Sequence, residues 1–226
     1  MVDPGLSERW SAVSERVADA ARSVGRDPSE LTTIVVTKFH PVELLQGLLE
    51  LGVVDFGENR HQEAQEKAAV LEGTAARWHF IGQLQSKKAR QVRRYADAVH
   101  SVDRLALVPL LDIAEGDPLD VFLQVDLSGD PGRGGAAPVD VDALADALVA
   151  APGLVLRGVM AVAPLGEEPR AAFARLRVLS ERVRAVDPAA SAISAGMSND
   201  FAEAIAEGAT HLRIGSAITG NRPARP

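Results

Sequence analysis

The chain has 226 residues, of which 46% are hydrophobic and 24% charged, so it can bury a sizeable core and is expected to form one domain over residues 1–226. It contains no cysteine, which excludes disulfides, thiolate metal sites and a cysteine nucleophile and agrees with a reducing cytoplasm. A net charge of −7 argues against nonspecific nucleic-acid binding, and no signal peptide or membrane span is recognisable.

The expected elements alternate along the whole chain. Trp10, Val13 and Val17 lie at helical spacing in an N-terminal helix that ends at Gly25. A β-branched strand over residues 31–38 follows, and then the alternation of helix and strand repeats. The further strands are expected at 53–58, 77–82, 98–103, 120–127, 154–162, 191–196 and 211–216. The helices between them are expected at 41–52, up to 73, and at 85–95, 104–114, 141–150, 170–186 and 201–207.

Eight short strands that alternate with helices predict an α/β protein with the (β/α)₈ TIM-barrel fold and an additional N-terminal helix. An open, doubly wound sheet is the alternative, but no G-x-G-x-x-G motif follows the first strand. Two segments rich in glycine and proline, 128–138 and 163–169, follow the fifth and sixth strands. They are expected at the face where barrels build their sites, either as solvated loops or as lids.

Lys38 is the most informative single residue, because it ends an apolar strand. Side chains alternate along a strand, so Lys38 shares a face with Ile34 and Val36. If those two fill the barrel interior, the lysine opens into the barrel mouth, where desolvation favours the neutral amine that attacks an aldehyde to form an imine. A lysine that extends to solvent from the strand end is the alternative.

The last two strands end in segments typical of a phosphate site. Arg213 lies in the eighth strand, and Gly215 and Ser216 follow where a helix is expected to begin. Ser198 has a comparable place after the seventh strand. Backbone N–H groups and hydroxyls at helix starts bind phosphate in many barrels, although a Gly-Ser pair is often only a helix cap. Together with Lys38, these segments predict a phosphorylated aldehyde held as an imine.

Seven motifs, in order over essentially the whole chain, resemble the pyridoxal-phosphate homeostasis protein family, single-barrel relatives of the alanine racemase N-terminal domain with cofactor fold type III. They are TTIVVTKFHP, DFGENRHQE, RWHFIGQLQSKK, HSVDR, LRGVMAVAP, ISAGMSND and HLRIGSAITGNR. The sequence departs from the family pattern at Phe39, His40, Lys87 and Arg133, none of which is an expected cofactor anchor. It also has Ser216 where threonine is common, which keeps the hydroxyl in place.

The resemblance implies a monomeric, cytoplasmic protein that stores pyridoxal 5′-phosphate (PLP) or delivers it to apo-enzymes. The implied cofactor-binding residues are Lys38, Asn59, Met197, Ser198, Arg213, Gly215 and Ser216. Lys38 would form a Schiff base with PLP, and Arg213 would face the pyridine nitrogen. The two serines and Gly215 would hold the phosphate, and the other two residues would line the ring pocket.

Whether the protein is also an enzyme stays open at this level. The Arg213 guanidinium can only donate to the pyridine nitrogen, which leaves the ring unprotonated and a weak electron sink. The racemases that this family resembles use a tyrosine from a C-terminal domain of the partner subunit, whereas this sequence ends at Pro226 and its one tyrosine, Tyr95, is expected to be a packing residue. No catalytic residue is therefore assigned. The alternatives are a slow PLP-dependent racemase or related enzyme and, less favoured, a cofactor-free Schiff-base aldolase.

The remaining polar residues carry weaker signals. The five histidines, His40, His61, His79, His100 and His211, lack ligand spacing, so no metal site is expected. His79 and His100 are expected to be satisfied core residues, and His211 is a candidate partner of Arg213. A basic group on the fourth helix is expected to be a solvated face, with an anion-binding or partner site as the alternative; it comprises Lys87, Lys88, Arg90, Arg93 and Arg94.

Overall fold

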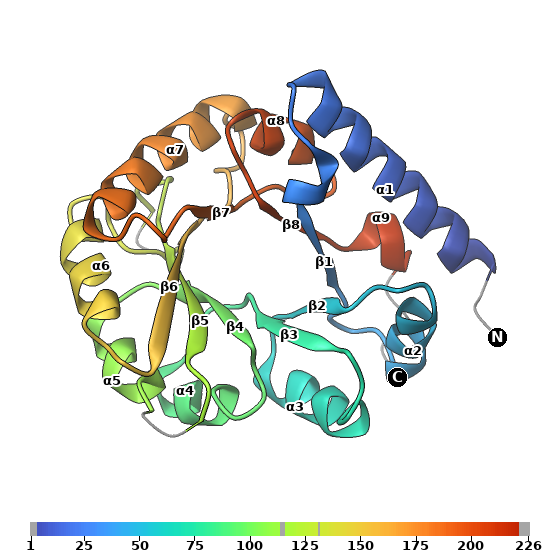
Figure 1. The fold of residues 1–226 in the computed structure, drawn as a ribbon, viewed down its shortest axis with the longest axis horizontal. Helices are drawn as coiled ribbons and strands as arrows, with labels where there is room; N and C mark the ends of the chain where they lie inside the picture. The colour runs from blue at the N-terminus through green and yellow to red at the C-terminus, as the bar shows by residue number, and fades with distance from the viewer. Residues whose placement is uncertain (1–3, 114–115, 131, 222–226) are drawn as a thin grey trace.

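The computed structural model describes residues 4–113, 116–130 and 132–221, which form a closed barrel of eight parallel strands in chain order (Figure 1). The strands are β1 (Thr32–Val36), β2 (Asp55–Glu58), β3 (Arg77–Phe80), β4 (Ala98–Val102), β5 (Leu119–Gln124), β6 (Leu154–Met160), β7 (Ala192–Ser194) and β8 (His211–Ile214). Val35 of β1 pairs with Phe56 of β2 on one side and with Ile214 of β8 on the other, which closes the barrel. The (β/α)₈ prediction is confirmed, and the open-sheet alternative is wrong.

The helices surround the barrel (Figure 1). They are α1 (Pro4–Ser23), α2 (Val42–Glu50), α3 (His61–Val70), α4 (Ser86–Val92), α5 (Val108–Leu111), α6 (Val141–Val149), α7 (Pro169–Val186), α8 (Phe201–Ala206) and α9 (Ser216–Thr219), with 3₁₀ turns η1 (Pro28–Glu30) and η2 (Leu105–Leu107). In place of the helix expected over 104–114, the structure has the two short elements η2 and α5, and α5 ends at Leu111. Of the expected domain 1–226, residues 1–3, 114–115, 131 and 222–226 lie outside the described residues.

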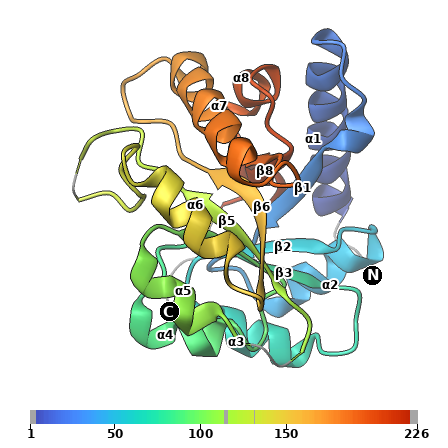
Figure 2. The same ribbon diagram turned by 60° about the vertical axis from the view of Figure 1, so that its left-hand side comes forward.

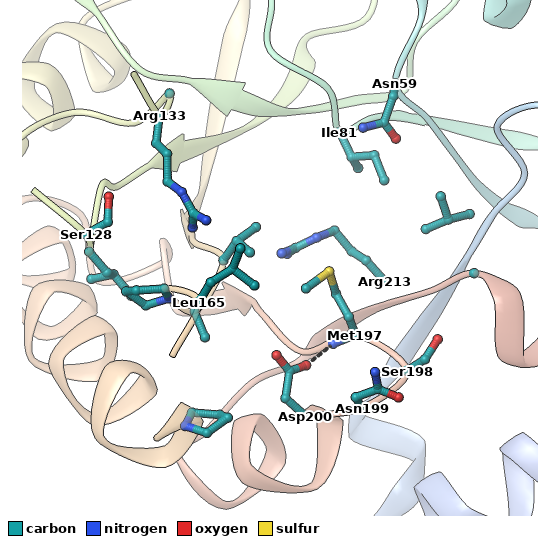
Figure 3. Close-up of a pocket in the computed structure, with 18 of the residues that line it drawn as sticks. Asn59, Ile81, Ser128, Arg133, Leu165, Met197, Ser198, Asn199, Asp200 and Arg213 are labelled. Carbon is teal, nitrogen blue, oxygen red and sulfur yellow. Dashed lines mark hydrogen bonds between the residues drawn. The ribbon is translucent and has the colours of Figure 1, made fainter. Parts of the chain in front are cut away.

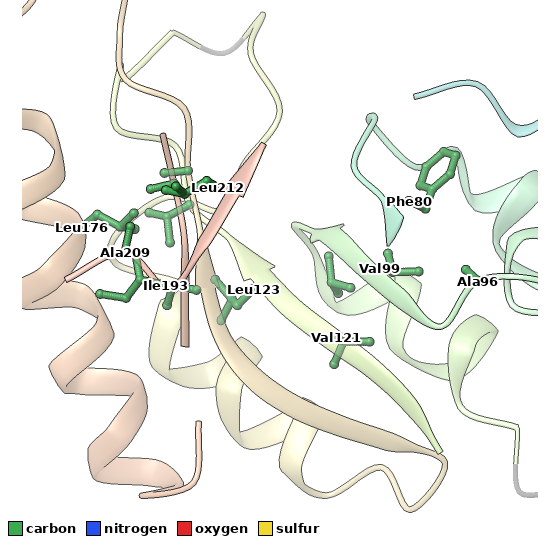
Figure 4. Packing of buried hydrophobic residues seen from close by; sticks show 14 of the residues in the cluster. Phe80, Ala96, Val99, Val121, Leu123, Leu176, Ile193, Ala209 and Leu212 are labelled. Atoms are coloured by element: carbon green, nitrogen blue, oxygen red, sulfur yellow. The ribbon is translucent and has the colours of Figure 1, made fainter. Parts of the chain in front are cut away.

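Two layers of side chains fill the molecule. The main hydrophobic cluster lies between the strands and the helices and includes Val121 and Leu123 of β5 (Figure 4). Phe122, between them in sequence, points the other way, as strand alternation requires, and its ring stacks on His100 at a centroid distance of 4.1 Å. The barrel interior is therefore partly polar, and its polar residues reach the end where the site lies.

The expected N-terminal helix is present as α1, which packs beside α8 and α9 (Figure 1). Arg9 Nε of α1 donates to the Ile218 carbonyl oxygen of α9 at 2.7 Å. Arg26 after α1 donates to the carbonyl oxygens of Ile205 and Ala209 at 3.0 and 2.7 Å. These bonds fix the helix against the last strand–helix unit. No helix in the described part of the chain has both the length and the apolar stretch needed to cross a bilayer.

The two glycine- and proline-rich loops lie at the same end of the barrel (Figure 2). The 128–138 loop, of which residue 131 is outside the described residues, returns onto the end of β5. Gln124 Nε2 donates to the Gly134 carbonyl oxygen at 2.8 Å, and the Ala136 N–H donates to the Gln124 carbonyl oxygen at 2.8 Å. The base of this loop is thus bonded to the strand that precedes it.

Candidate functional site

A cavity of about 830 Å³ opens where the carboxyl ends of the strands meet (Figure 3). The residues that line it come mainly from the segments after β1, β2, β5, β6, β7 and β8. All seven residues expected at the site lie in this lining: Lys38, Asn59, Met197, Ser198, Arg213, Gly215 and Ser216. Carboxyl ends of barrel strands are the usual place for binding sites in this fold.

Lys38 reaches the cavity from a turn and not from the strand itself. The sequence predicted a strand up to residue 38, but β1 ends at Val36. The chain then turns, because the His40 N–H donates to the Thr37 carbonyl oxygen at 3.1 Å, and Phe39 takes a positive φ of 70°. Lys38 is half-buried, and Val36 beside it also lines the cavity.

The segments after β7 and β8 place backbone and hydroxyl groups on the same wall. Gly215 directly precedes α9, which begins at Ser216. Ser198 lies in the turn before α8, and the Met197 N–H in that turn donates to Asp200 Oδ1 at 2.5 Å. This arrangement offers the N–H groups and hydroxyls that commonly hold phosphate.

Asn59 is held at the opposite wall by a close approach of two chain segments. A side chain at Gly82 would lie 2.2 Å from the Asn59 carbonyl oxygen, so only glycine permits this crossing. The Asn59 Oδ1 atom is buried and has no hydrogen-bond partner among the described residues. Leaving such an acceptor unpaired costs about 1–3 kcal/mol, which favours a ligand or a water as its donor.

Arg213 extends into the middle of the cavity (Figure 3) and is held by two hydrogen bonds. Its guanidinium donates to Ser194 Oγ at 2.7 Å and to the Ala161 carbonyl oxygen at 2.8 Å. Burial lowers the pKa of Arg213 to about 10, and the negative charge of Asp200 opposes that shift. The guanidinium therefore remains protonated at neutral pH, and it can only donate to a ligand atom.

Arg213 ends a chain of hydrogen bonds through the barrel interior. Ser194 Oγ lies 2.9 Å from His100 Nδ1, and His100 Nε2 lies 3.0 Å from His79 Nδ1. His79 Nε2 lies 2.9 Å from Asp55 Oδ1, at the amino end of β2. Because arginine only donates and a carboxylate only accepts, all bonds run in one direction if both histidines are neutral and protonated on Nε2.

The electrostatics agree with this direction. Burial lowers the pKa of His100 well below its usual value, and His100 therefore stays neutral at pH 7. Burial alone would raise the pKa of Asp55, but hydrogen bonds from His79 and Arg77 outweigh it and lower that pKa. The sequence pointed to His79 and His100 only as satisfied core residues. The sequence did not predict that Asp55 and Ser194 belong to this hydrogen-bond chain. The signal that could have identified them is a polar residue at an inward-facing position of a strand.

Several other residues considered from the sequence lie elsewhere. Tyr95 follows α4, and its ring stacks on His61 at 5.8 Å in a separate groove between α3 and α4. Ser194, and not His211, receives the Arg213 N–H; His211 contacts Thr210 Oγ1 at 2.8 Å. No group of three potential metal ligands occurs among the residues that the structure describes.

Comparison with known proteins identifies the family. A sequence profile described as "Alanine racemase, N-terminal domain" matches residues 12–223. The chain belongs to the alanine racemase N-terminal domain family. A relative of this chain is the pyridoxal phosphate homeostasis protein of Pseudomonas aeruginosa. The two sequences are 41% identical over 223 residues, which cover 96% of each chain. The resemblance inferred from the motifs is thereby confirmed.

Solved structures similar to this chain agree with this assignment. PipY of Synechococcus elongatus, solved with PLP bound, superposes with a TM-score of 0.79 at 36% identity, covering 90% of this chain and 100% of PipY. Alanine racemase of Corynebacterium glutamicum superposes with a TM-score of 0.73 at 15% identity, covering 95% of this chain and 62% of the racemase. The racemase shares the fold, whereas PipY is also similar in sequence.

Proposed function

We propose that this protein binds PLP covalently through Lys38 and serves the intracellular homeostasis of that cofactor. The observation that carries the proposal is the convergence, in one cavity, of a lysine amine, a buried guanidinium and two helix-start segments. These are the groups that an aldehyde, a pyridine nitrogen and a phosphate each require. The relatives named for PLP homeostasis and the PLP-bound PipY structure support the same assignment.

The polar and apolar groups that line the cavity suit the chemical parts of PLP. Ser198, Gly215 and Ser216 would hold the phosphate through hydroxyl and backbone N–H groups. Asn59 has a buried oxygen available as an acceptor, and Met197 offers an apolar contact for the ring. Each part of the ligand thus meets a group of suitable chemistry.

PLP, when bound, supplies an aldehyde that condenses reversibly with a primary amine. Lys38 provides that amine beside the apolar Val36 at the cavity wall. Arg213, protonated and fixed by Ser194 and Ala161, would donate to the ring nitrogen without giving up its proton. An arginine at that position favours holding the cofactor over withdrawing electrons through it, which is the behaviour expected of a store.

The finer parts of the proposal concern the cell. We propose that the chain acts as one domain and as a cytoplasmic monomer, from which PLP is released to apo-enzymes that require it. The absence of cysteine and the net charge of −7 support a reducing compartment and argue against nucleic acid as a partner.

The test is a covalent-labelling experiment. Purified protein is mixed with PLP, reduced with borohydride and mapped by peptide mass spectrometry, with Lys38→Ala and, as a control, the exposed Lys87→Ala. Before reduction we expect a visible absorption band in the wild type and in Lys87→Ala, which borohydride removes, and after reduction stable labelling of Lys38 in both proteins. Lys38→Ala should show neither the band nor the label. Equal labelling of all three proteins, or none in the wild type, would refute the proposal.

A further inference from the structure

The turn that carries Lys38 has an unfavourable backbone conformation. Phe39 has a φ of 70°, a left-handed value that costs a bulky L-residue roughly 1–2 kcal/mol. Such a conformation persists only where surrounding groups hold it in place. Groups of β2 and α3, outside the cavity lining, bond to this turn.

A cluster of charged side chains, buried except for the partly exposed Glu63, bonds to the peptide groups on both sides of Lys38. Lys67 Nζ of α3 donates to the Thr37 carbonyl oxygen at 2.9 Å, just before Lys38. The Phe39 N–H, just after Lys38, donates to Glu63 Oε1, also on α3. Lys67 Nζ and Glu63 Oε1 are themselves 2.9 Å apart. The Glu63–Lys67 ion pair thus forms hydrogen bonds with the backbone on both sides of Lys38.

Glu58 at the end of β2 completes the cluster. Its Oε1 accepts from Lys67 Nζ at 2.6 Å and from the Thr37 hydroxyl at 2.7 Å. The Lys67 and Glu58 side chains are only 7% and 1% exposed, so both charges are removed from water.

Stability alone is a poor explanation for such a cluster. A buried ion pair generally contributes little more than apolar residues of similar volume, because desolvating the charges offsets their attraction. Apolar residues, however, could bond neither the Thr37 carbonyl oxygen nor the Phe39 N–H. What the charges add at this place is a fixed geometry for the peptide groups that flank Lys38.

We propose that Glu63 and Lys67 are positioning residues that hold the Lys38 turn so that the lysine amine enters the cavity in reactive orientation. This inference rests on the proposed function, because it concerns the reaction of Lys38 with an aldehyde. Neither residue lines the cavity, so each acts on the ligand only through the turn. The cluster should therefore govern covalent attachment and leave noncovalent recognition of ring and phosphate unchanged.

The test separates these two steps with two ligands. PLP can attach to the amine, whereas pyridoxine 5′-phosphate keeps the ring and the phosphate but lacks the aldehyde. The variants are Glu63→Ala, which removes the acceptor for the Phe39 N–H; Glu63→Gln, which keeps an oxygen there; and the control Glu66→Ala, at an exposed position of the same helix.

We expect Glu63→Ala to slow the attachment of PLP by about tenfold, the factor that corresponds to about 1.4 kcal/mol, while its Kd for pyridoxine 5′-phosphate stays within about twofold of wild type, the change left by a few tenths of a kcal/mol. Glu63→Gln should recover most of the rate, and Glu66→Ala should match wild type. A Glu63→Ala rate equal to that of Glu66→Ala, or a parallel loss for both ligands, would overturn the inference.

A second measurement needs no alanine variant. Amide hydrogen exchange at Phe39 should be slow in the wild type, because its N–H is bonded to Glu63. Fast exchange there would also overturn the inference. If the wild type neither attaches PLP nor binds pyridoxine 5′-phosphate, the proposed function fails, which is a result distinct from failure of the positioning role.

Discussion

Ser194→Ala should destabilise the protein strongly, because one hydroxyl joins Arg213 to the interior hydrogen-bond chain. The substitution removes the 2.7 Å bond from the guanidinium and the 2.9 Å bond to His100 Nδ1 in a fully buried position. A bond to a charged group contributes about 1.5–3 kcal/mol and a neutral bond about 1 kcal/mol, so we expect a loss of about 3 kcal/mol in unfolding free energy. For a chain of this size that lowers Tm by roughly 6–12 °C.

Ser101→Ala is the matched control for this experiment. Ser101 is also fully buried, but its hydroxyl has no hydrogen-bond partner among the described residues. Removing it should leave the unfolding free energy unchanged or raise it by up to about 1 kcal/mol. Both variants are measured by urea unfolding and by calorimetry. If Ser194→Ala is no less stable than Ser101→Ala, the hydrogen-bond chain does not hold Arg213 as described.

Two further predictions concern the turn and the pH dependence. Phe39→Gly and Phe39→Ala both remove the ring that lies under Arg60, but only alanine keeps a Cβ at φ 70°, so the glycine variant should be more stable by about 1 kcal/mol in urea titrations. Equal midpoints would contradict the strain at this turn. Burial lowers the pKa of His100 below 6.5 and that of His211 to about 4, so on acidification the unfolded chain binds these protons first. The free energy of unfolding should therefore decrease as the pH is lowered past about 6.5, by up to about 1.4 kcal/mol per pH unit for each histidine. His211→Asn should flatten this slope between about pH 6.5 and 4, and an unchanged slope would exclude His211 as its source.

The barrel and its mouth were predictable because they depend on local patterns. Strand–helix alternation gives the closed barrel, and strand ends in a barrel meet at one face. Lys38, Arg213 and Ser216 therefore come together in the structure as their positions at strand ends suggested. The end of β1 was misplaced by two residues, since the turn after Val36 depends on bonds from α3 that a strand pattern does not contain.

The supporting groups behind the site could not be predicted in the same way. Lys67 lies in a helix of mainly charged and small residues, a pattern typical of a solvated surface, yet its side chain is buried. Its partners Glu58 and Thr37 are separated from it in sequence and meet it only in three dimensions. Likewise, the bond from Ser194 to His100 spans strands β7 and β4, which are not neighbours in the barrel.

The pairing of β1 with β8 also bears on when the protein can first bind its ligand during synthesis. Ile34, four residues before Lys38, lies opposite Arg213 in the closed barrel. The strand that leads to Lys38 and the strand that carries Arg213 are thus the earliest and the latest to leave the ribosome, and their pairing requires a long-range closure, which is slow. Ligand binding should therefore require the completed fold. It should also stabilise the pairing of β1 with β8, and this stabilisation should increase with ligand concentration. A nascent chain that lacks β8, and with it Arg213, would bind the cofactor poorly.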